Sequence, residues 1–273
     1  MKTANKPTTD LAPVESFMIV DRYAGLDEEA KAELLDEMND FSGENTLVYK
    51  TIKVPSGETP VFIISDGEES DSAKEIEGVI IFTHRLNGYW PNAMGSTPDG
   101  DKAPLCSSMD GITGMNRETG EIRDCATCPY NQFGSSRDGG KGKACKNMRR
   151  MYLIQNNDPD LYMLSVPPTS IRDINKQLTK ILGKGIPYTG ILIGLKLQKA
   201  VNANRITYNK VILENRGELP PSVAAQVKAL RTEIKRKYME QAITPEDYAV
   251  EQTTAPADPG AFTDIPPEEL PFS

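Results

Sequence analysis

Residues 150–198, RMYLIQNNDPDLYMLSVPPTSIRDINKQLTKILGKGIPYTGILIGLKLQ, carry the densest secondary-structure signals in the chain. Two runs rich in aromatic and aliphatic residues, 150–156 and 161–166, are separated by Asn-Asp-Pro-Asp, which is a strong turn signal. Ser170, followed by an acid three residues later, predicts a helix N-cap after two prolines. Apolar residues at helical spacing then continue to Leu182, before two nearby glycines that end a helix. The pattern therefore predicts a hairpin followed by a helix.

Strands and helices of similar quality extend outward on both sides of this stretch. In 191–198 the apolar residues alternate with polar ones, as in a strand with one buried face. Seven short strands with a helix between late strands are typical of a mainly β, α+β protein. We expect an OB-fold-like barrel, and a generic α+β sheet is the alternative. The remaining expected strands are 46–54, 60–65, 78–84 and 206–214, and the remaining expected helices are 27–41 and 222–242.

Residues 85–148 differ from their surroundings, because they contain Gly, Asn, Asp, Ser and all four cysteines but almost no periodic apolar pattern. A loop-rich stretch of this length needs disorder or a metal to account for it. We therefore expect an OB-like core over 17–242 with a zinc-binding insertion at about 85–148. Residues 1–16 and the acidic tail 243–273 are expected to be disordered.

The four cysteines are Cys106, Cys125, Cys128 and Cys145. The CxxC pair places two thiolates on one tight turn, and one distant cysteine on each side completes a set of four. A closed four-thiolate zinc site supports folding rather than catalysis. An iron–sulfur cluster, which also takes four thiolates, and unligated or redox-paired thiols remain as alternatives. His84, the sole histidine, is expected to end a strand or touch a ligand rather than bind the metal.

Cations and aromatic residues alternate in and beside this insertion. Single-stranded nucleic acid is held by cations along its backbone and by aromatic rings stacked on its bases. No helical motif that reads duplex grooves is present. Trp90, the only tryptophan, lies in a polar setting beside Tyr89. The residues that we expect to contact DNA are Arg85, Tyr89, Trp90, Tyr130, Phe133, Arg137, Lys141, Lys143, Lys146, Arg149, Arg150, Lys196, Lys199, Tyr208 and Lys210.

The charge distribution is uneven along the chain. The formal net charge is −8, yet residues 102–216 hold 18 Lys and Arg against nine Asp and Glu, and residues 241–273 hold seven acids and no Lys or Arg. A basic middle indicates a polyanionic partner, and an acidic tail indicates a role in protein interactions. No signal peptide or membrane-length apolar run is recognisable, so we expect a cytoplasmic protein.

The chain ends in DIPPEELPFS. This resembles the acidic tip of bacterial single-stranded DNA-binding proteins, in which acids precede a hydrophobic residue, Pro and a terminal Phe. The resemblance implies that Leu270, Pro271 and Phe272 insert into basic pockets of replication and recombination proteins, while Glu268 and Glu269 meet cations. Zinc-bearing loops, a barrel and an acidic tail together look like the single-strand-binding replication proteins of phages, which would place the protein in a bacterial host.

We therefore expect a non-enzymatic protein that coats single-stranded DNA and recruits partners through its tail. One alternative is a zinc-stabilised adaptor, or a recombination or transcription accessory protein, that binds another protein. A less favoured alternative is a metal-dependent nucleic-acid-processing enzyme. Hydrolytic phosphate chemistry usually needs clustered carboxylates or histidines around a metal, and no such cluster or nucleophile–base arrangement is recognisable.

Overall fold

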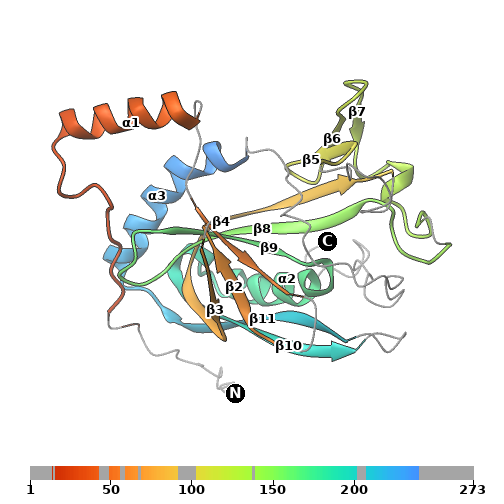
Figure 1. The fold of residues 1–273 in the computed structure, drawn as a ribbon. Helices are drawn as coiled ribbons and strands as arrows, with labels where there is room; N and C mark the ends of the chain where they lie inside the picture. The colour runs from red at the N-terminus through yellow and green to blue at the C-terminus, as the bar shows by residue number, and fades with distance from the viewer. Residues whose placement is uncertain are drawn as a thin grey trace, which may run out of the picture.

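A computed structural model describes residues 14, 16–42, 49–55, 59–66, 69–91, 103–136, 139–201 and 207–239. Within these ranges the chain forms three α-helices and eleven strands (Figure 1). The helices are α1 (Glu28–Ser42), α2 (Pro168–Leu182) and α3 (Pro221–Met239). The strands are β1 (Lys50–Lys53), β2 (Phe62–Ser65), β3 (Ser70–Ala73), β4 (Glu75–Tyr89), β5 (Cys106–Ser108), β6 (Thr113–Asn116), β7 (Ile122–Asp124), β8 (Lys146–Ile154), β9 (Leu161–Val166), β10 (Ile191–Val201) and β11 (Thr207–Glu218).

The described strands form one sheet in the order β3-β2-β1-β9-β8-β4-β5-β6-β7, and β10 and β11 branch from β4. Only β1 and β9 pair in parallel; the other pairings are antiparallel. The main path ends at β3 on one side and β7 on the other, so the sheet is not closed into a barrel. The mixed α+β class is confirmed, but the expected OB-fold-like barrel is not. Strand periodicity sets which side chains share a face and carries no information about closure.

β4 is the central strand, and its partner changes along its length. Residues 75–78 pair with β10, residues 79–88 pair with β8, and residues 87–89 pair also with β5. Gly78 lies where β10 and β8 both approach, and a Cβ there would stand 2.5 Å from the Ile154 carbonyl oxygen. A register shift between Ile80 and Phe82 adds a bulge, which bends the strand. The expected strand 78–84 is therefore the middle of a longer one.

Two apolar cores lie on opposite faces of β4, β8 and β9. α2 packs on one face with a cluster that includes Ile80, Met151 and Leu164. α3 packs on the other face with a cluster that includes Ile81, Tyr152 and Met163. Figure 1 shows α2 between this sheet and the β10–β11 hairpin, which also contributes to the first core. The sheet thus curls around α2.

The start of α2 differs from the expected Ser170 N-cap. The cap position is Pro167, with no side-chain hydrogen bond, and proline occupies the first turn. Ser170 is fully buried, and its hydroxyl oxygen accepts a hydrogen bond from the Val211 backbone N–H at 2.8 Å. Asp173 forms an ion pair with Lys210. The serine therefore joins α2 to β11, because proline at the first helical position is already suited to starting a helix.

Most other elements agree with the sequence patterns, including α1, β9, β10 and α3 over its described residues. Strand β3 was not among the expected strands, because Ser-Asp-Ser-Ala carries no apolar pattern. Strands β5, β6 and β7 were also not expected, since each has only three or four residues. Residues 1–13, 240–242 and the tail 243–273 lie outside the described residues.

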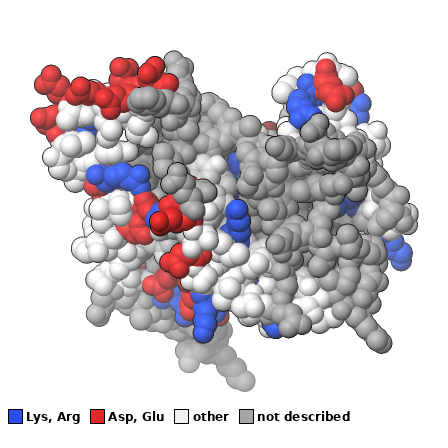
Figure 2. Space-filling model, viewed as in Figure 1, with Lys and Arg blue, Asp and Glu red and all other residues white. Residues whose placement is uncertain are grey.

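Helix α1 carries a strongly acidic surface. It begins with Glu28 and Glu29 and has no basic residue in its last turn. Figure 2 shows acidic side chains gathered over this helix. Within the described part of the chain, no helix is both long and apolar enough to cross a membrane.

His84 lies inside β4 rather than at its end, and its side chain is buried. Its ring lies beside those of Phe82 and Tyr152, with centroid distances of 5.3 and 6.0 Å, and these two rings are 6.1 Å from each other. Nδ1 lies 2.8 Å from the Met109 carbonyl oxygen and 2.9 Å from that of Arg85, so Nδ1 carries the proton. Burial lowers the pKa of His84 below its ordinary 6.5, and the nearby charge of Arg150 lowers it further. The folded protein therefore holds this ring neutral.

This neutral ring predicts a loss of stability in mild acid. Below about pH 6.5 the unfolded chain protonates His84 while the folded chain resists, so the free energy of unfolding decreases as pH falls. The His84 contribution is at most about 1.4 kcal/mol per pH unit. We expect the free energy of unfolding of His84→Gln, measured by urea denaturation at pH 7.5, 6.5 and 5.5, to decrease less with falling pH than that of the wild type. His84 is the only histidine, so parallel curves for the two proteins would contradict this assignment.

Candidate functional site

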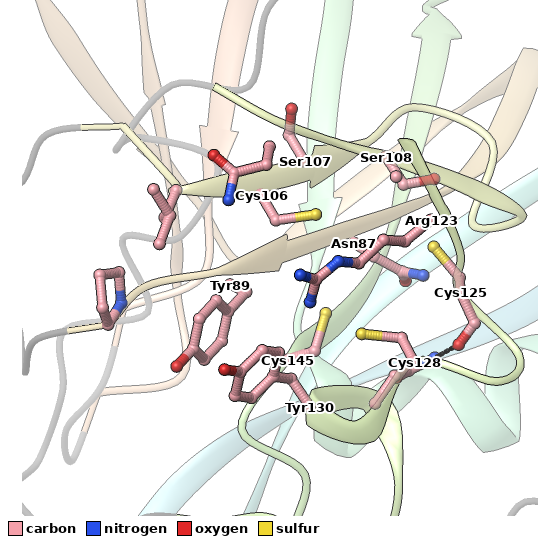
Figure 3. A pocket seen from close by; sticks show the side chains of 15 residues that line it. Asn87, Tyr89, Cys106, Ser107, Ser108, Arg123, Cys125, Cys128, Tyr130 and Cys145 are labelled. Atoms are coloured by element: carbon pink, nitrogen blue, oxygen red, sulfur yellow. Dashed lines mark hydrogen bonds between the residues drawn. The ribbon is translucent and has the colours of Figure 1, made fainter. Parts of the chain in front are cut away.

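The four cysteines line one pocket of about 210 Å³ at the far end of β4 (Figure 3). Cys106 begins β5 and is the register partner of Tyr89, and Cys125 directly follows β7. Cys128 precedes the short 3-10 helix Pro129–Asn131, and Cys145 directly precedes β8. Residues up to 39 positions apart therefore meet because β5, β6 and β7 fold the insertion back toward β8.

The thiols are close enough to influence one another. Burial, and after it the neighbouring Cys125, Cys128 and Cys106, together raise the pKa of Cys145 to about 12. Burial likewise raises the pKa of Cys106, and Cys128 and Cys125 raise it to a smaller extent. Figure 3 shows the sulfur atoms around a common space, with the Arg123 side chain between them. All four thiols are free.

The fit of a metal to this pocket depends on the donors and on the space between them. Four thiols are the set that zinc and iron–sulfur clusters take. A Cβ on Gly114 would lie 3.1 Å from Cys106 Sγ and 3.5 Å from Cys125 Sγ, so only glycine leaves the two sulfurs unobstructed. Among the described residues, however, no three His, Cys, Asp or Glu side chains are arranged to hold a metal ion as they stand. The donor chemistry fits a metal, whereas the sulfur positions do not form a complete coordination shell.

Hydrogen bonds to the cysteine backbone hold Tyr130 in place. The Cys145 N–H donates to the Tyr130 carbonyl oxygen at 2.8 Å. The side chain of the next residue, Asn131, donates from Nδ2 to the Cys125 carbonyl oxygen at 2.7 Å. The Asn131 backbone N–H donates to the Cys128 carbonyl oxygen at 2.9 Å. The position of Tyr130 therefore depends on the cysteine turn.

Aromatic rings stand at the mouth of this pocket. The Tyr130 ring stacks on Tyr89 with a centroid distance of 4.2 Å and an interplanar angle of 16°. Tyr130 is 40% exposed, and Phe133 nearby in sequence is 47% exposed. The Lys143 ammonium lies 4.8 Å from the centre of the Phe133 ring. Exposed rings with a cation over one of them form a surface that can stack on planar groups.

A chain of amides connects these rings with the sheet. Asn147 Nδ2 donates to Asn87 Oδ1 and to Asn131 Oδ1, both at 2.9 Å. Lys143 Nζ donates to Asn147 Oδ1 at 3.3 Å. Asn87 and Asn147 are register partners on β4 and β8, and Asn131 belongs to the cysteine turn. The amides thus join the insertion to the central strands.

The predicted DNA-contacting residues of β4 and β8 divide between the two faces of the sheet. Arg85 and Tyr89 lie on the face that carries Asn87, and Arg149 is the register partner of Arg85. Trp90 packs instead with Leu86, Met148 and Met109 on the other face. Arg150 also lies on that other face and is only 1% exposed. Alternation along each strand separates these neighbours in sequence.

The other predicted contacts do not all join this site. Lys141 and Lys146 are exposed, whereas Arg137 lies outside the described residues. Lys146 precedes Asn147 on β8 and therefore lies on the opposite face, with Met148. Lys196 pairs with Glu75 and Glu214. Lys210 pairs with Asp173, while Lys199 and Tyr208 lie nearby on β10 and β11. The tail residues Glu268, Glu269, Leu270, Pro271 and Phe272 lie outside the described residues.

The sequence interpretation missed Asn87, Asn131, Asn147 and Arg123. Asn87 could have been found by counting two residues from either Arg85 or Tyr89 along a strand, since alternate residues share a face. Asn147 could have been found in the same way, since it lies two residues from Arg149 on β8. Asn131 and Arg123 have no such signal, because their place in the site depends on how the cysteine loops fold.

Comparison of the chain with protein-family models, curated proteins and solved structures found no match. The fold and the site by themselves define a class: an α+β protein with an open sheet that carries a four-cysteine pocket beside a cationic, aromatic and amide-rich face.

The Asn131 bridge yields a stability prediction. Asn131→Ala would leave the Cys125 carbonyl and one Asn147 N–H without their partners, so we expect a loss of about 1–3 kcal/mol in the free energy of unfolding. Thr127→Ala is the control, because the Thr127 hydroxyl is exposed and its bond to Asp124 is 3.5 Å long. It should cost less than about 0.5 kcal/mol. Equal effects of the two variants in urea denaturation would argue against the bridge.

Proposed function

We propose that this chain is a single-stranded DNA-binding protein that acts without catalysis in DNA replication or recombination. The observation that carries the proposal is the exposed Tyr130 ring stacked on Tyr89, together with the exposed Phe133 three residues later, over which Lys143 lies. Bases of a single strand can stack on such rings in any sequence, while cations meet the phosphates. The binding face would be a strip of open sheet and its adjoining loops, not the interior of a barrel.

The cysteine pocket has a supporting role in this proposal. Cys106, Cys125, Cys128 and Cys145 would hold one zinc ion, which would supply the bonds that fix the insertion. Because the backbone of the cysteine turn positions Tyr130, the ion would also determine where the stacking surface lies. Reduced thiols of this kind suit the cytoplasm.

The acidic tail would complete the function. Glu268, Glu269, Leu270, Pro271 and Phe272 resemble the partner-docking tip of bacterial single-stranded DNA-binding proteins. An additional Ser273 follows the phenylalanine, and prolines interrupt the acidic run. The tail would recruit replication or recombination proteins while the basic face holds DNA.

A protein-binding adaptor is the second candidate, favoured by the β6–β7 hairpin. Met115 and Ile122 are register partners there and are 54% and 68% exposed. Large apolar side chains side by side on a projecting hairpin can mark a protein contact. They lie on the face of the sheet opposite Tyr89, so the two functions can be tested by separate variants.

Loss of the stacking ring should weaken binding to single strands. We expect Tyr130→Ala to reduce the affinity for fluorescein-labelled oligo-dT by about tenfold or more, because stacking one base contributes about 1–3 kcal/mol. Fluorescence anisotropy is the appropriate measurement, since Trp90 lies on the other face of the sheet. Ile122→Ala is the matched control on the hairpin and should bind like the wild type. No binding of the wild type at low salt would remove the proposal and favour the adaptor.

Zinc content and DNA affinity should change together. We expect about one zinc per chain and a loss of both zinc and oligo-dT affinity in Cys128→Ser, since structural zinc sites use all four ligands. Ala126→Ser places the same hydroxymethyl group on the same turn and should retain both properties. Elemental analysis separates zinc from iron. Full zinc content in Cys128→Ser would contradict a four-thiolate site.

A further inference from the structure

Arg85 and Arg149 form a like-charged pair across two adjacent strands. They are register partners on β4 and β8, so their side chains leave the sheet on the same face. Directly opposed residues of an antiparallel pair have Cβ atoms about 5 Å apart. The two guanidinium groups can therefore reach a single small anion.

Neither arginine is neutralised within the described part of the chain. Arg85 is exposed, and no described carboxylate pairs with either residue. Arg149 is partly buried and makes one hydrogen bond among the described residues, from Nη1 to Thr83 Oγ1 at 3.2 Å. Its Nε is buried without an acceptor. Like charges directly opposite one another destabilise a sheet, so an anion at this place would relieve repulsion.

The turn after β5 positions Arg85. Gly111 has a φ of 72°, and a Cβ there would lie 2.7 Å from the Cβ of Arg85. Asp110 does not neutralise the arginine; one of its carboxylate oxygens accepts hydrogen bonds from the Ile112 and Thr113 N–H groups and from the Ser108 hydroxyl. The turn is thus stabilised by hydrogen bonds within itself, and its glycine packs against the aliphatic part of the Arg85 side chain.

We propose that Arg85 and Arg149 together bind one backbone phosphate of the single strand, and that Gly111 is the positioning residue of this clamp. The inference rests on the proposed function and adds the ligand group and its binding residues. Arginine suits this role because its planar donors match phosphate oxygens in pairs.

The surroundings favour a nucleic-acid phosphate over a carboxylate of a protein partner. Tyr89 follows Arg85 by four residues on the same face of β4, which places the stacked rings roughly 13 Å further along the strand. Asn87 lies between them on that face. A nucleotide chain supplies a repeating phosphate and base, so one strand can use the clamp and the rings at once.

Salt dependence of oligo-dT binding by the full chain tests the clamp. For single strands, the slope of log K against log salt has a magnitude of about 0.7 for each phosphate that the protein neutralises. We expect Arg85→Gln and Arg149→Gln each to weaken binding about tenfold, and the double variant to lower the magnitude of the slope by about 0.7. A decrease of about 1.4 would mean two separate phosphates and overturn the clamp, as would an unchanged slope. Arg85 is exposed, so its variant remains informative if Arg149→Gln fails to fold.

A matched glycine pair tests the positioning role. Gly111 and Gly120 both have positive φ, of 72° and 69°, but a Cβ on Gly120 would meet nothing within 4 Å. Alanine therefore strains the backbone similarly at both sites and disturbs Arg85 only at one. We expect Gly111→Ala to reduce the affinity and the salt slope in the direction of Arg85→Gln, and Gly120→Ala to leave both unchanged. Identical behaviour of the two alanine variants would overturn the role of Gly111.

An uncharged backbone separates failure of the clamp from failure of the function. On oligo-dT with methylphosphonate linkages, the arginine variants should bind like the wild type, while Tyr130→Ala should remain weaker than the wild type. If the arginine variants lose as much affinity for this probe as for ordinary oligo-dT, the clamp is wrong although DNA binding stands. If the wild type binds neither probe at low salt, the proposed function itself fails, and the clamp with it.

Discussion

The hydrogen bonding of β4 is the constraint on which the rest of the structure depends. Its fifteen residues pair with β10 at one end, with β8 over most of the length and with β5 at the other end. Buried backbone polar groups must be paired, so each partner is obligatory. The β10–β11 hairpin and the strands of the cysteine insertion both pair with the sheet through this one strand, and Gly78 leaves room for the Ile154 carbonyl oxygen of β8.

The alternation of side chains along β4 then separates two environments. Near its middle both faces are covered, one by the α2 core and the other by the α3 core. Toward its end one face carries Arg85, Asn87 and Tyr89, while the other buries His84 and Leu86. The same strand therefore supports a neutral, buried histidine and an exposed arginine at adjacent positions, because adjacent residues point to opposite sides.

The cysteine insertion is small, and its strands are too short to be stable alone. It is held by the pairing of β5 with β4, by the Asn131 and Asn147 amides and by the turn around Asp110. These contacts connect the pocket, the stacked tyrosines and the arginine pair through a few side chains. A change at the cysteines is thereby transmitted to the surface that we propose for DNA, since Tyr130 belongs to the cysteine turn.

The sequence by itself determined the helices, most of the strands and the cysteine set, because periodicity and glycine or proline signals are local properties. It also singled out Tyr89, Tyr130 and Arg149 as surface candidates. Only the tertiary structure decided that the sheet stays open, that Arg149 stands opposite Arg85, and that Asn131 meets Asn147. The physical reason is that register and the path of short loops depend on contacts between distant residues, for which a local pattern carries no signal.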